Sequence, residues 1–374
     1  MKIVVAMDSF KGSLTAVQAC DIVAEAIRST IRDAVVVTKP MADGGEGTAM
    51  TLMAAAGGRW VEVEVVGPLP ETQVAGGFVW LPQTHTAVVE MAVASGLPLL
   101  RPDQYNPLKT TTFGTGQLIH AAIEHGAEQV LLAIGGSATV DGGIGAAMAL
   151  GWRFLKRDGH EIALGGGQLA EIDQIIPPQE ETAAVVRVLC DVDNPLCGEH
   201  GAAHIYGPQK GATPEMVETL DAGLMHLAGL IRSQLGQNIK DLPGAGAAGG
   251  LAAGAISFLD GRLVSGVDEV IAQNRLREEL ADADWVITGE GRFDHQSLRG
   301  KVVSGVARAA REGGAKVAVI AGQVHLSREV YAQAGIEVAL PCMTGSMTLD
   351  HALAHVETLL AEATRRFAGT HLPM

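Results

Sequence analysis

The stretches that decide the fold are Ile3-Val-Val-Ala-Met7 near the N-terminus, and Trp285-Val-Ile-Thr288 and Lys316-Val-Ala-Val-Ile-Ala321 in the last third of the chain. Each is a short apolar run followed by a stretch with helical character, and residues 34–38 and 338–341 add two similar runs. Buried strands that alternate with helices are typical of a parallel sheet covered on both faces. The expected fold class is α/β, with a flavodoxin-like doubly wound parallel-sheet domain formed by both chain ends.

The middle of the chain has a different pattern and predicts an inserted, second mixed α/β domain. Val61-Glu-Val-Glu-Val-Val66 alternates like a half-buried strand, and Gly67-Pro-Leu-Pro70 is a plausible crossing point between domains. A return to the first domain is expected close to residue 263. We therefore expect residues 1–66 and 263–374 to form the flavodoxin-like domain and residues 67–262 to form the insert.

Composition excludes several classes of protein. The 374 residues carry 27 basic and 42 acidic side chains, a formal charge of −15, which argues against a nucleic-acid partner. The apolar share of 47% against 18% charged residues argues against disorder. The uncharged run 242–259 is too rich in glycine and alanine for a membrane span, and the first residues have no signal-peptide layout. The four cysteines have no paired or zinc-binding spacing, so we expect reduced thiols and a cytoplasmic location.

Three loops of the flavodoxin-like domain carry acidic and basic side chains directly after predicted strands. They are Asp8-Ser9-Phe-Lys11, Asp43-Gly-Gly-Glu46, and Glu290-Gly-Arg292-Phe-Asp294, which Lys301 follows seven residues later. The carboxyl ends of parallel strands meet at one edge of a sheet, where ligands bind. The sequence therefore predicts that these loops converge at one edge.

The inserted domain contributes three more polar loops. Gly135-Gly136-Ser137-Ala-Thr139-Val-Asp141-Gly142-Gly143 joins a predicted strand to an apolar helix, and its backbone N–H groups could cradle phosphate oxygens. Asp191-Val-Asp193 ends another strand, and Lys210 lies between glutamine and glycine in a further loop. Carboxylates, lysines and glycine-rich turns are what phosphoryl transfer requires. Each loop taken alone is also compatible with a turn, a helix cap or a solvated surface.

Two other interpretations of the sequence stay open. No P-loop sequence occurs, but Gly244-Ala-Gly246-Ala-Ala-Gly249 matches the dinucleotide-binding spacing without an apolar strand before it. An NAD-dependent dehydrogenase that uses this loop is therefore a distant alternative. A non-catalytic sensor of small anions is another. The twelve histidines show no metal-ligand spacing.

Taken together, the loops resemble those of the bacterial glycerate kinases that produce 2-phosphoglycerate. The resemblance runs along nearly the whole chain in the order typical of that family. Its segments are Asp8-Ser-Phe-Lys11, Ala42-Asp-Gly-Gly-Glu-Gly-Thr48, Ser95-Gly-Leu97, Phe113-Gly-Thr-Gly116, Gly135-Gly-Ser-Ala-Thr-Val-Asp-Gly-Gly143, Cys190-Asp-Val-Asp-Asn-Pro195, Gly207-Pro-Gln-Lys-Gly-Ala-Thr213, Gly246-Ala-Ala-Gly-Gly250 and Ile287-Thr-Gly-Glu-Gly-Arg292.

The resemblance implies ATP-dependent phosphorylation of D-glycerate to 2-phosphoglycerate with Mg²⁺, in glycerate, glyoxylate or sugar-acid catabolism. It also implies an active site in the cleft between the two domains. Phosphorylation of the C3 hydroxyl, or of a related small hydroxy acid, stays open because it needs only a small change of substrate pose. Whether the chain forms a homodimer also stays open.

The resemblance and the residue chemistry together suggest roles for individual side chains. Asp191 or Asp193 is expected to accept the proton of the glycerate hydroxyl, and Asp191 is better placed because it directly follows a strand. The expected catalytic residues are Asp191, Lys11 and Arg292, and the expected metal ligands are Asp141 and Asp193. The expected substrate-binding residues are Asp8, Ser9, Asp43, Glu46, Asp294 and Lys301. The expected nucleotide- and phosphate-binding residues are Gly135, Gly136, Ser137, Thr139, Gly142, Lys210 and Glu290.

Overall fold

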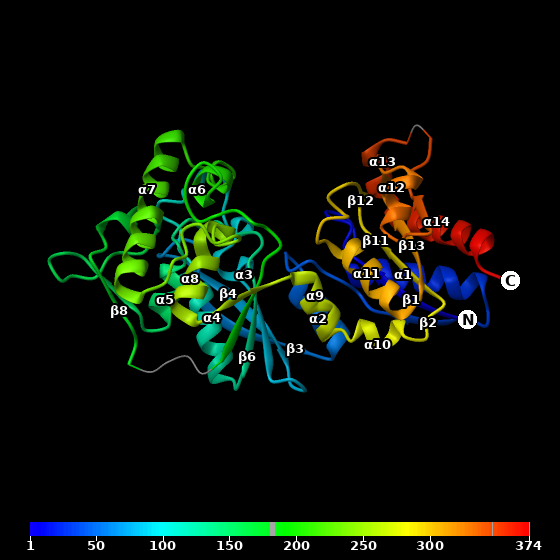
Figure 1. Cartoon of the computed structure of the whole chain (residues 1–374), viewed down its shortest axis with the longest axis horizontal. Helices are drawn as coiled ribbons and strands as arrows, with labels where there is room; N and C mark the ends of the chain where they lie inside the picture. The colour runs from blue at the N-terminus through cyan, green and yellow to red at the C-terminus, as the bar shows by residue number, and fades with distance from the viewer. Residues whose placement is uncertain (180–183, 346, 374) are drawn as a thin grey trace. The chain divides into compact units, whose positions relative to one another are not determined.

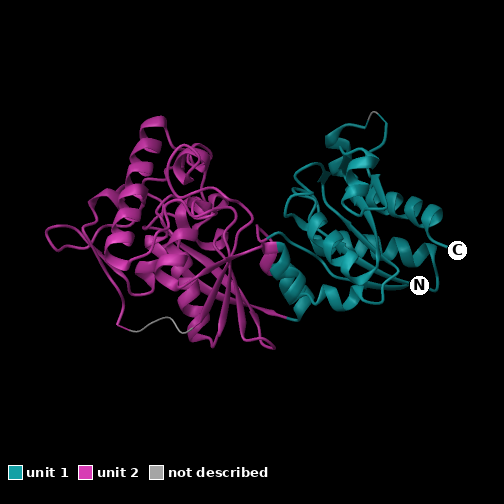
Figure 2. Cartoon of the chain, in the orientation of Figure 1, with its two compact units in different colours: residues 1–43, 50–57, 267–374 teal, residues 44–49, 58–266 magenta. Residues whose placement is uncertain are grey.

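The computed structural model describes residues 1–179, 184–345 and 347–373, and within them the chain divides into two units (Figures 1 and 2). Unit 1 contains residues 1–43, 50–57 and 267–374, and unit 2 contains residues 44–49 and 58–266. Unit 1 is therefore built from both ends of the chain, and unit 2 is inserted into it.

Unit 1 is built on one five-stranded sheet in which every neighbouring pair is parallel. Its strands are β1 (Lys2–Met7), β2 (Val35–Thr38), β11 (Trp285–Gly289), β13 (Lys316–Ala321) and β15 (Val338–Pro341). The spatial order β15-β13-β11-β1-β2 is that of the flavodoxin-like doubly wound fold. The predicted fold class is confirmed.

Helices α1 (Ala16–Thr30), α11 (Val302–Gly313), α12 (Arg328–Gln333) and α14 (Val356–His371) pack against strands of this sheet (Figure 1). The chain also forms α9 (Gly266–Gln273), α10 (Leu276–Leu280) and α13 (Leu349–Ala354) in this part of the molecule. Ile3, Ile287 and Ile320 from three neighbouring strands belong to one buried apolar cluster with side chains of α1 and α14. Trp285 meets Phe367 of α14 edge to face, with ring centroids 5.2 Å apart. This apolar packing anchors the central strands.

The C-terminal helical segment is divided into α13 and α14 at His355. The φ angle of His355 is −123°, outside the helical range. Its backbone N–H donates to the His351 carbonyl at 3.2 Å, and its ring Nδ1 lies 2.9 Å from the same oxygen. This side-chain contact competes with the regular helix pattern, which periodicity along the sequence does not show.

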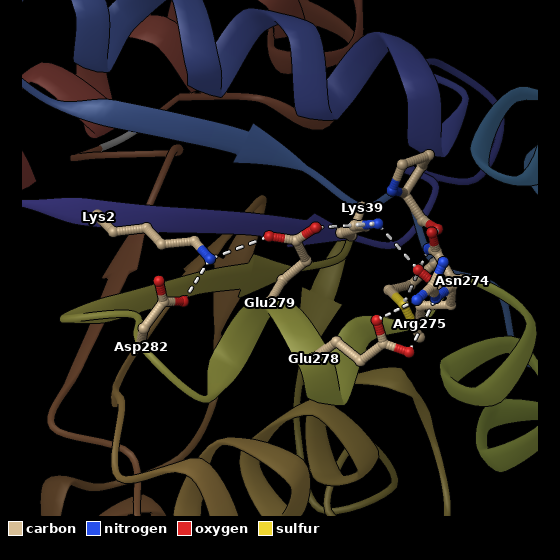
Figure 3. Close-up of polar contacts among 9 residues, drawn as sticks. Lys2, Lys39, Asn274, Arg275, Glu278, Glu279 and Asp282 are labelled. Atoms are coloured by element: carbon tan, nitrogen blue, oxygen red, sulfur yellow. Dashed lines mark hydrogen bonds and ion pairs between the residues drawn. The ribbon is translucent and has the colours of Figure 1, made fainter.

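Ion pairs connect α10 and the turn after it to residues of β1 and the segment after β2. Figure 3 shows Lys2 between Glu279 and Asp282, with Nζ to carboxylate distances of 3.0 and 2.5 Å. Lys39, just after β2, lies 3.6 Å from Glu279 and donates to the backbone carbonyl of Asn274 at 3.0 Å. The segment that leads from β2 to Asp43 is therefore fixed at its start.

Unit 2 contains a six-stranded sheet of order β10-β9-β6-β5-β4-β3. Its strands are β3 (Arg59–Val66), β4 (Gln73–Leu81), β5 (Thr86–Glu90), β6 (Gln129–Ala133), β9 (Val185–Leu189) and β10 (Arg262–Val264). The pairs among β5, β6, β9 and β10 are parallel, and β3 and β4 are antiparallel to their neighbours. The predicted mixed α/β character of the insert is confirmed.

Smaller elements complete unit 2. Its helices include α3 (Ala92–Ser95), α4 (Phe113–Glu124), α5 (Ile144–Ala149), α6 (Ala202–Tyr206), α7 (Pro214–Leu230) and α8 (Leu251–Leu259), and β7 (Arg153–Leu155) pairs with β8 (Gln174–Ile176). Helix α2 (Thr48–Ala56) begins in unit 2 and continues in unit 1.

The crossing expected after residue 66 lies earlier, after Gly57, because β3 pairs along its whole length with β4 of unit 2. The last crossing, after Gly266, lies close to the expected residue 263. The expectation of an active site between two domains stays a prediction. All four cysteines are free thiols. Within the described ranges, none of the helices combines the length and the apolar character needed to span a bilayer.

Candidate functional site

Unit 1 contains a cavity of about 460 Å³ that gathers eight of the residues singled out in the sequence. They are Asp8, Ser9, Lys11, Asp43, Glu290, Arg292, Asp294 and Lys301. They come from loops that follow β1, β2 and β11, and from the start of α11. The predicted convergence of these remote loops at the carboxyl edge of the sheet is confirmed. The edge between β1 and β11 is also where the strand order reverses, the usual ligand position in such folds.

Backbone hydrogen bonds continue the sheet into these loops. The Asp8 N–H donates to the Gly289 carbonyl at 2.9 Å, and the Met41 N–H donates to the Met7 carbonyl at 2.9 Å. The loop after β11 runs beside the loop after β13, since the Gly322 N–H donates to the Glu290 carbonyl at 3.1 Å. The carboxylates are therefore held by backbone that is itself fixed in the sheet.

Gly289 is required where β11 ends. A Cβ atom at this position would lie 1.8 Å from the Ile320 carbonyl oxygen, far inside contact distance. Only glycine lets β11 and β13 approach so closely there, directly before Glu290. Two short parallel strands, β12 (Arg292–Phe293) and β14 (Gln323–Val324), then continue the pairing past the main sheet.

Carboxyl groups crowd the cavity. Burial, reinforced by the neighbouring Asp43 and Glu290, raises the pKa of Asp8 to about 7. Burial also raises the pKa of Glu290, against the opposing effects of a hydrogen bond with Ser297 and the charge of Lys301. Glu290 Oε1 is buried and has no hydrogen-bond partner among the described residues. A cation placed here would relieve both the repulsion and the missing contact.

Positive side chains line the same cavity. Lys11 is exposed, Lys301 is half-buried, and Arg292 pairs with Asp294 at 3.0 Å from Nε to Oδ2. Lys301 is the residue directly before α11, so the amino end of that twelve-residue helix adds positive potential nearby. Clustered cations of this kind suit an anionic ligand.

The cavity also has an apolar wall that the sequence analysis missed. We define this wall as Phe10, Met343, Leu349, Leu353, Val356 and Leu359, all of which line the cavity. Leu349 and Leu353 are one helical turn apart on α13. That spacing was visible in the sequence, but it is also the ordinary pattern of a helix that packs on a core.

Asp191 and Asp193, which were predicted as the base and a metal ligand, are exposed after β9 in unit 2. Asp191 follows β9 by two residues, and its Oδ1 accepts the Gly266 N–H at 3.2 Å. Asp193 and Glu46 are also exposed. Glu90 is a buried carboxyl that the sequence analysis overlooked, and it accepts the Ala49 N–H at 2.7 Å, beside the Glu46 loop.

The remaining predicted residues form a buried network in unit 2. Asp141 is fully buried, and its carboxylate accepts the Thr112 N–H at 2.8 Å, the Thr112 hydroxyl at 2.9 Å and the Gly143 N–H at 3.1 Å. Burial raises the pKa of Asp141 despite these donors. A metal ion at this carboxylate would have to displace them, so the geometry favours a structural role over the predicted metal ligation.

Lys210 lies in a separate loop and belongs to the same buried network. It is 2% exposed, and its Nζ donates to the Ser137 hydroxyl at 2.6 Å and to the Thr139 carbonyl at 2.7 Å. Burial lowers the pKa of Lys210 to about 7. Thr139 and Gly142 are buried as well, whereas Gly136 is exposed and Gly135 is half-buried. Of the predicted phosphate-binding residues in unit 2, only these two glycines leave their backbone open to a ligand.

The glycines of the 244–249 loop serve the packing of unit 2. A Cβ at Gly246 would lie 2.2 Å from the Pro195 carbonyl oxygen, and one at Gly249 would lie 1.9 Å from that of Thr139. These glycines are thus required by the protein's own backbone. The spacing of these glycines therefore no longer supports the dinucleotide-binding alternative.

Comparisons with known proteins point to one family. The model of the glycerate kinase family matches residues 3–372. The chain is 46% identical to a glycerate kinase of Halalkalibacterium halodurans, over 98% of this chain and 97% of the relative. It is 42% identical to the glycerate 2-kinase of Escherichia coli, over 99% and 98%. A crystal structure of a glycerate kinase 2 candidate from Salmonella typhimurium LT2 superimposes with a TM-score of 0.89 at 41% identity, covering 99% of this chain and 98% of that one. The chain therefore belongs to the glycerate kinase family.

Proposed function

We propose that this glycerate kinase transfers the γ-phosphoryl group of ATP to the C2 hydroxyl of D-glycerate, with Mg²⁺, and releases 2-phosphoglycerate and ADP. The observation that carries the proposal is the cavity of unit 1, in which Lys11, Arg292 and Lys301 lie among four carboxyl groups. Both substrates are anions, so they need cations at the binding site. The similarity to a relative named glycerate 2-kinase supports the C2 position.

The donor groups of the cavity fit Mg²⁺. Asp8, Asp43 and Glu290 offer the hard carboxylate oxygens that Mg²⁺ prefers. Among residues 1–179, 184–345 and 347–373, no group of three or more His, Cys, Asp or Glu side chains is placed to hold a metal ion by itself. Mg²⁺ is usually held by one or two carboxylates together with substrate phosphates and water.

We assign the ion to one or two of these three carboxylates in preference to Asp141, whose oxygens accept hydrogen bonds from Thr112 and Gly143, with Asp193 kept as a further ligand candidate. Bound there, Mg²⁺ would neutralise charge on the phosphates during transfer. Lys11, Arg292 and Lys301 would hold the phosphates and the glycerate carboxylate through charge-assisted hydrogen bonds. Asp191, which is exposed and accepts the Gly266 N–H, would accept the proton of the C2 hydroxyl.

One reaction tests the proposal. The purified chain is incubated with ATP, Mg²⁺ and D-glycerate, and ³¹P NMR assigns the product. A phosphorus signal coupled to the single C2 proton supports the proposal. Coupling to the two C3 protons would move the reaction to the primary hydroxyl, and the absence of any phosphoglycerate would exclude this donor and acceptor pair.

A further inference from the structure

The apolar wall of the unit 1 cavity does not match the polar chemistry of glycerate. A three-carbon acid with two hydroxyls and a carboxylate has no apolar face to cover large side chains. Yet Leu349 is 58% exposed and Leu353 is 42% exposed, and both line the cavity from one side of α13. Two exposed leucines that share one cavity wall form an apolar surface that a ligand could cover.

Charge and size indicate what kind of ligand fits. The apolar wall borders the same space as Lys11, Arg292 and Lys301. A ligand that satisfies both must have a flat or apolar part joined to several negative charges. The volume of about 460 Å³ falls in the usual range for small-molecule and cofactor sites. A nucleoside triphosphate combines these properties, since its base is largely apolar on both faces and its phosphates are anionic.

The polar loop of unit 2 does not offer this combination. Its side chains Thr139, Asp141 and Lys210 are buried and bonded within the unit or packed in its interior. The exposed backbone of Gly135 and Gly136 could meet an anion, but it provides no surface for a base.

We propose that the apolar wall holds the purine base of the donor nucleotide, with the phosphates directed toward Lys11, Arg292 and Lys301. This inference rests on ATP being the phosphoryl donor. It places the base at α13, a helix to which the sequence analysis gave no function. It also assigns the main nucleotide contacts to unit 1, whereas the sequence predicted most of them in the Gly135–Asp141 loop of unit 2.

Two variants test the base contact without adding charge near the phosphates. Leu353→Asn and Leu349→Asn replace exposed leucines with neutral polar side chains, so the fold is expected to survive. Val35→Asn is the matched control, because Val35 is 59% exposed in unit 1 and begins β2, at the end of the sheet opposite the loops that line the cavity. Circular dichroism and the melting temperature check that each variant is folded.

Isothermal titration measures binding of two probes, ATP–Mg²⁺ and tripolyphosphate–Mg²⁺, which has the phosphates without the base. In Leu353→Asn we expect the Kd of ATP to rise about tenfold, with the KM for ATP following it. The Kd of tripolyphosphate and the KM for D-glycerate are expected to stay within about twofold. Leu349→Asn should act in the same direction, and Val35→Asn should match the unmodified chain.

Three results would overturn the inference. An unchanged Kd for ATP in both leucine variants would remove the base from this wall. Equal weakening of ATP and tripolyphosphate would indicate damage to the phosphate contacts instead. If the unmodified chain binds neither probe, ATP is not the donor and the proposed function fails together with the inference. The first two results leave the proposed function standing.

Discussion

The polar loops of unit 1 and those of unit 2 use the same residue types, aspartate, lysine, serine and glycine, but they bury them differently. In unit 1, Asp8 and Glu290 line a cavity, crowd one another and have raised pKa values. In unit 2, Asp141 and Lys210 are buried and hydrogen-bonded to neighbouring groups, and of this network Thr139 Oγ1 alone lacks a partner among the described residues. A buried network whose polar atoms are hydrogen-bonded stabilises a fold. Crowded carboxyl groups at a cavity, with shifted pKa values and a polar atom that lacks a partner, are typical of a ligand-binding site.

Removal of the Asp141 carboxylate gives the largest effect that this contrast predicts. In Asp141→Ala, the Thr112 N–H and hydroxyl and the Gly143 N–H lose their acceptor. Because each unsatisfied buried donor costs about 1–3 kcal/mol, we expect the free energy of unfolding to fall by about 3 kcal/mol. Asp141→Asn, which keeps one oxygen, should lose about 1 kcal/mol. Urea unfolding measures the free energy of unfolding of both variants. If Asp141→Ala is as stable as the unmodified chain but inactive, Asp141 has a role in the reaction and not in the fold.

Asp191 is an exposed carboxylate of unit 2, and its replacement should affect catalysis without affecting the fold. Asp191→Asn removes the proposed base, so kcat should fall at least about a hundredfold while the melting temperature stays nearly constant. Glu199→Gln, a nearby exposed carboxylate with no proposed role, is the control. Steady-state kinetics with ATP and D-glycerate provide the measurement, and a near-normal kcat would show that another group accepts the proton.

Replacement of Asp8 should raise the stability of the chain and lower its activity. Its pKa of about 7 in the fold lies above the usual 3.8, so the folded chain binds more protons than the unfolded chain between these values. Stability should therefore fall as the pH rises from about 4 to about 7. Asp8→Asn removes that loss and should raise the melting temperature at pH 8 by about 2–4 °C, the shift that about 1 kcal/mol produces.

The same substitution should lower activity, since it removes a proposed cation ligand. Thermal unfolding without ligands, from pH 4 to pH 8, tests the stability effect, with Asp33→Asn as an exposed control. If Asp8→Asn melts at or below the temperature of the unmodified chain at pH 8, the crowding of carboxyl groups in unit 1 is not destabilising.

Much of unit 1 could be predicted from the sequence because its signals are local. The strands of residues 3–7, 285–288 and 316–321 are continuous apolar runs, and a parallel sheet then brings the loops after them to one edge. This geometric rule correctly brought together Asp8, Asp43 and Glu290 without knowledge of any side-chain contact.

The burial of the unit 2 loop could not be predicted in the same way, because it depends on packing between distant segments. A Cβ at Gly142 would lie 2.6 Å from Leu227 on α7, and one at Gly143 would lie 3.0 Å from Gly254 on α8. Nothing within the loop's own sequence shows that these helices cover it. The apolar wall of unit 1 was missed for the reverse reason: leucines on α13 look like core residues until their exposure is known.

Hydrogen exchange with and without ATP–Mg²⁺ and D-glycerate tests most directly whether the ligand-binding chemistry lies at the sheet edge of unit 1. In the free chain, the buried amides of residues 139–143 should already exchange slowly and change little when ligands are added. The amides of residues 289–301 should exchange at least about tenfold more slowly once ligands are bound. Protection confined to residues 139–143, with none in 289–301, would contradict this account.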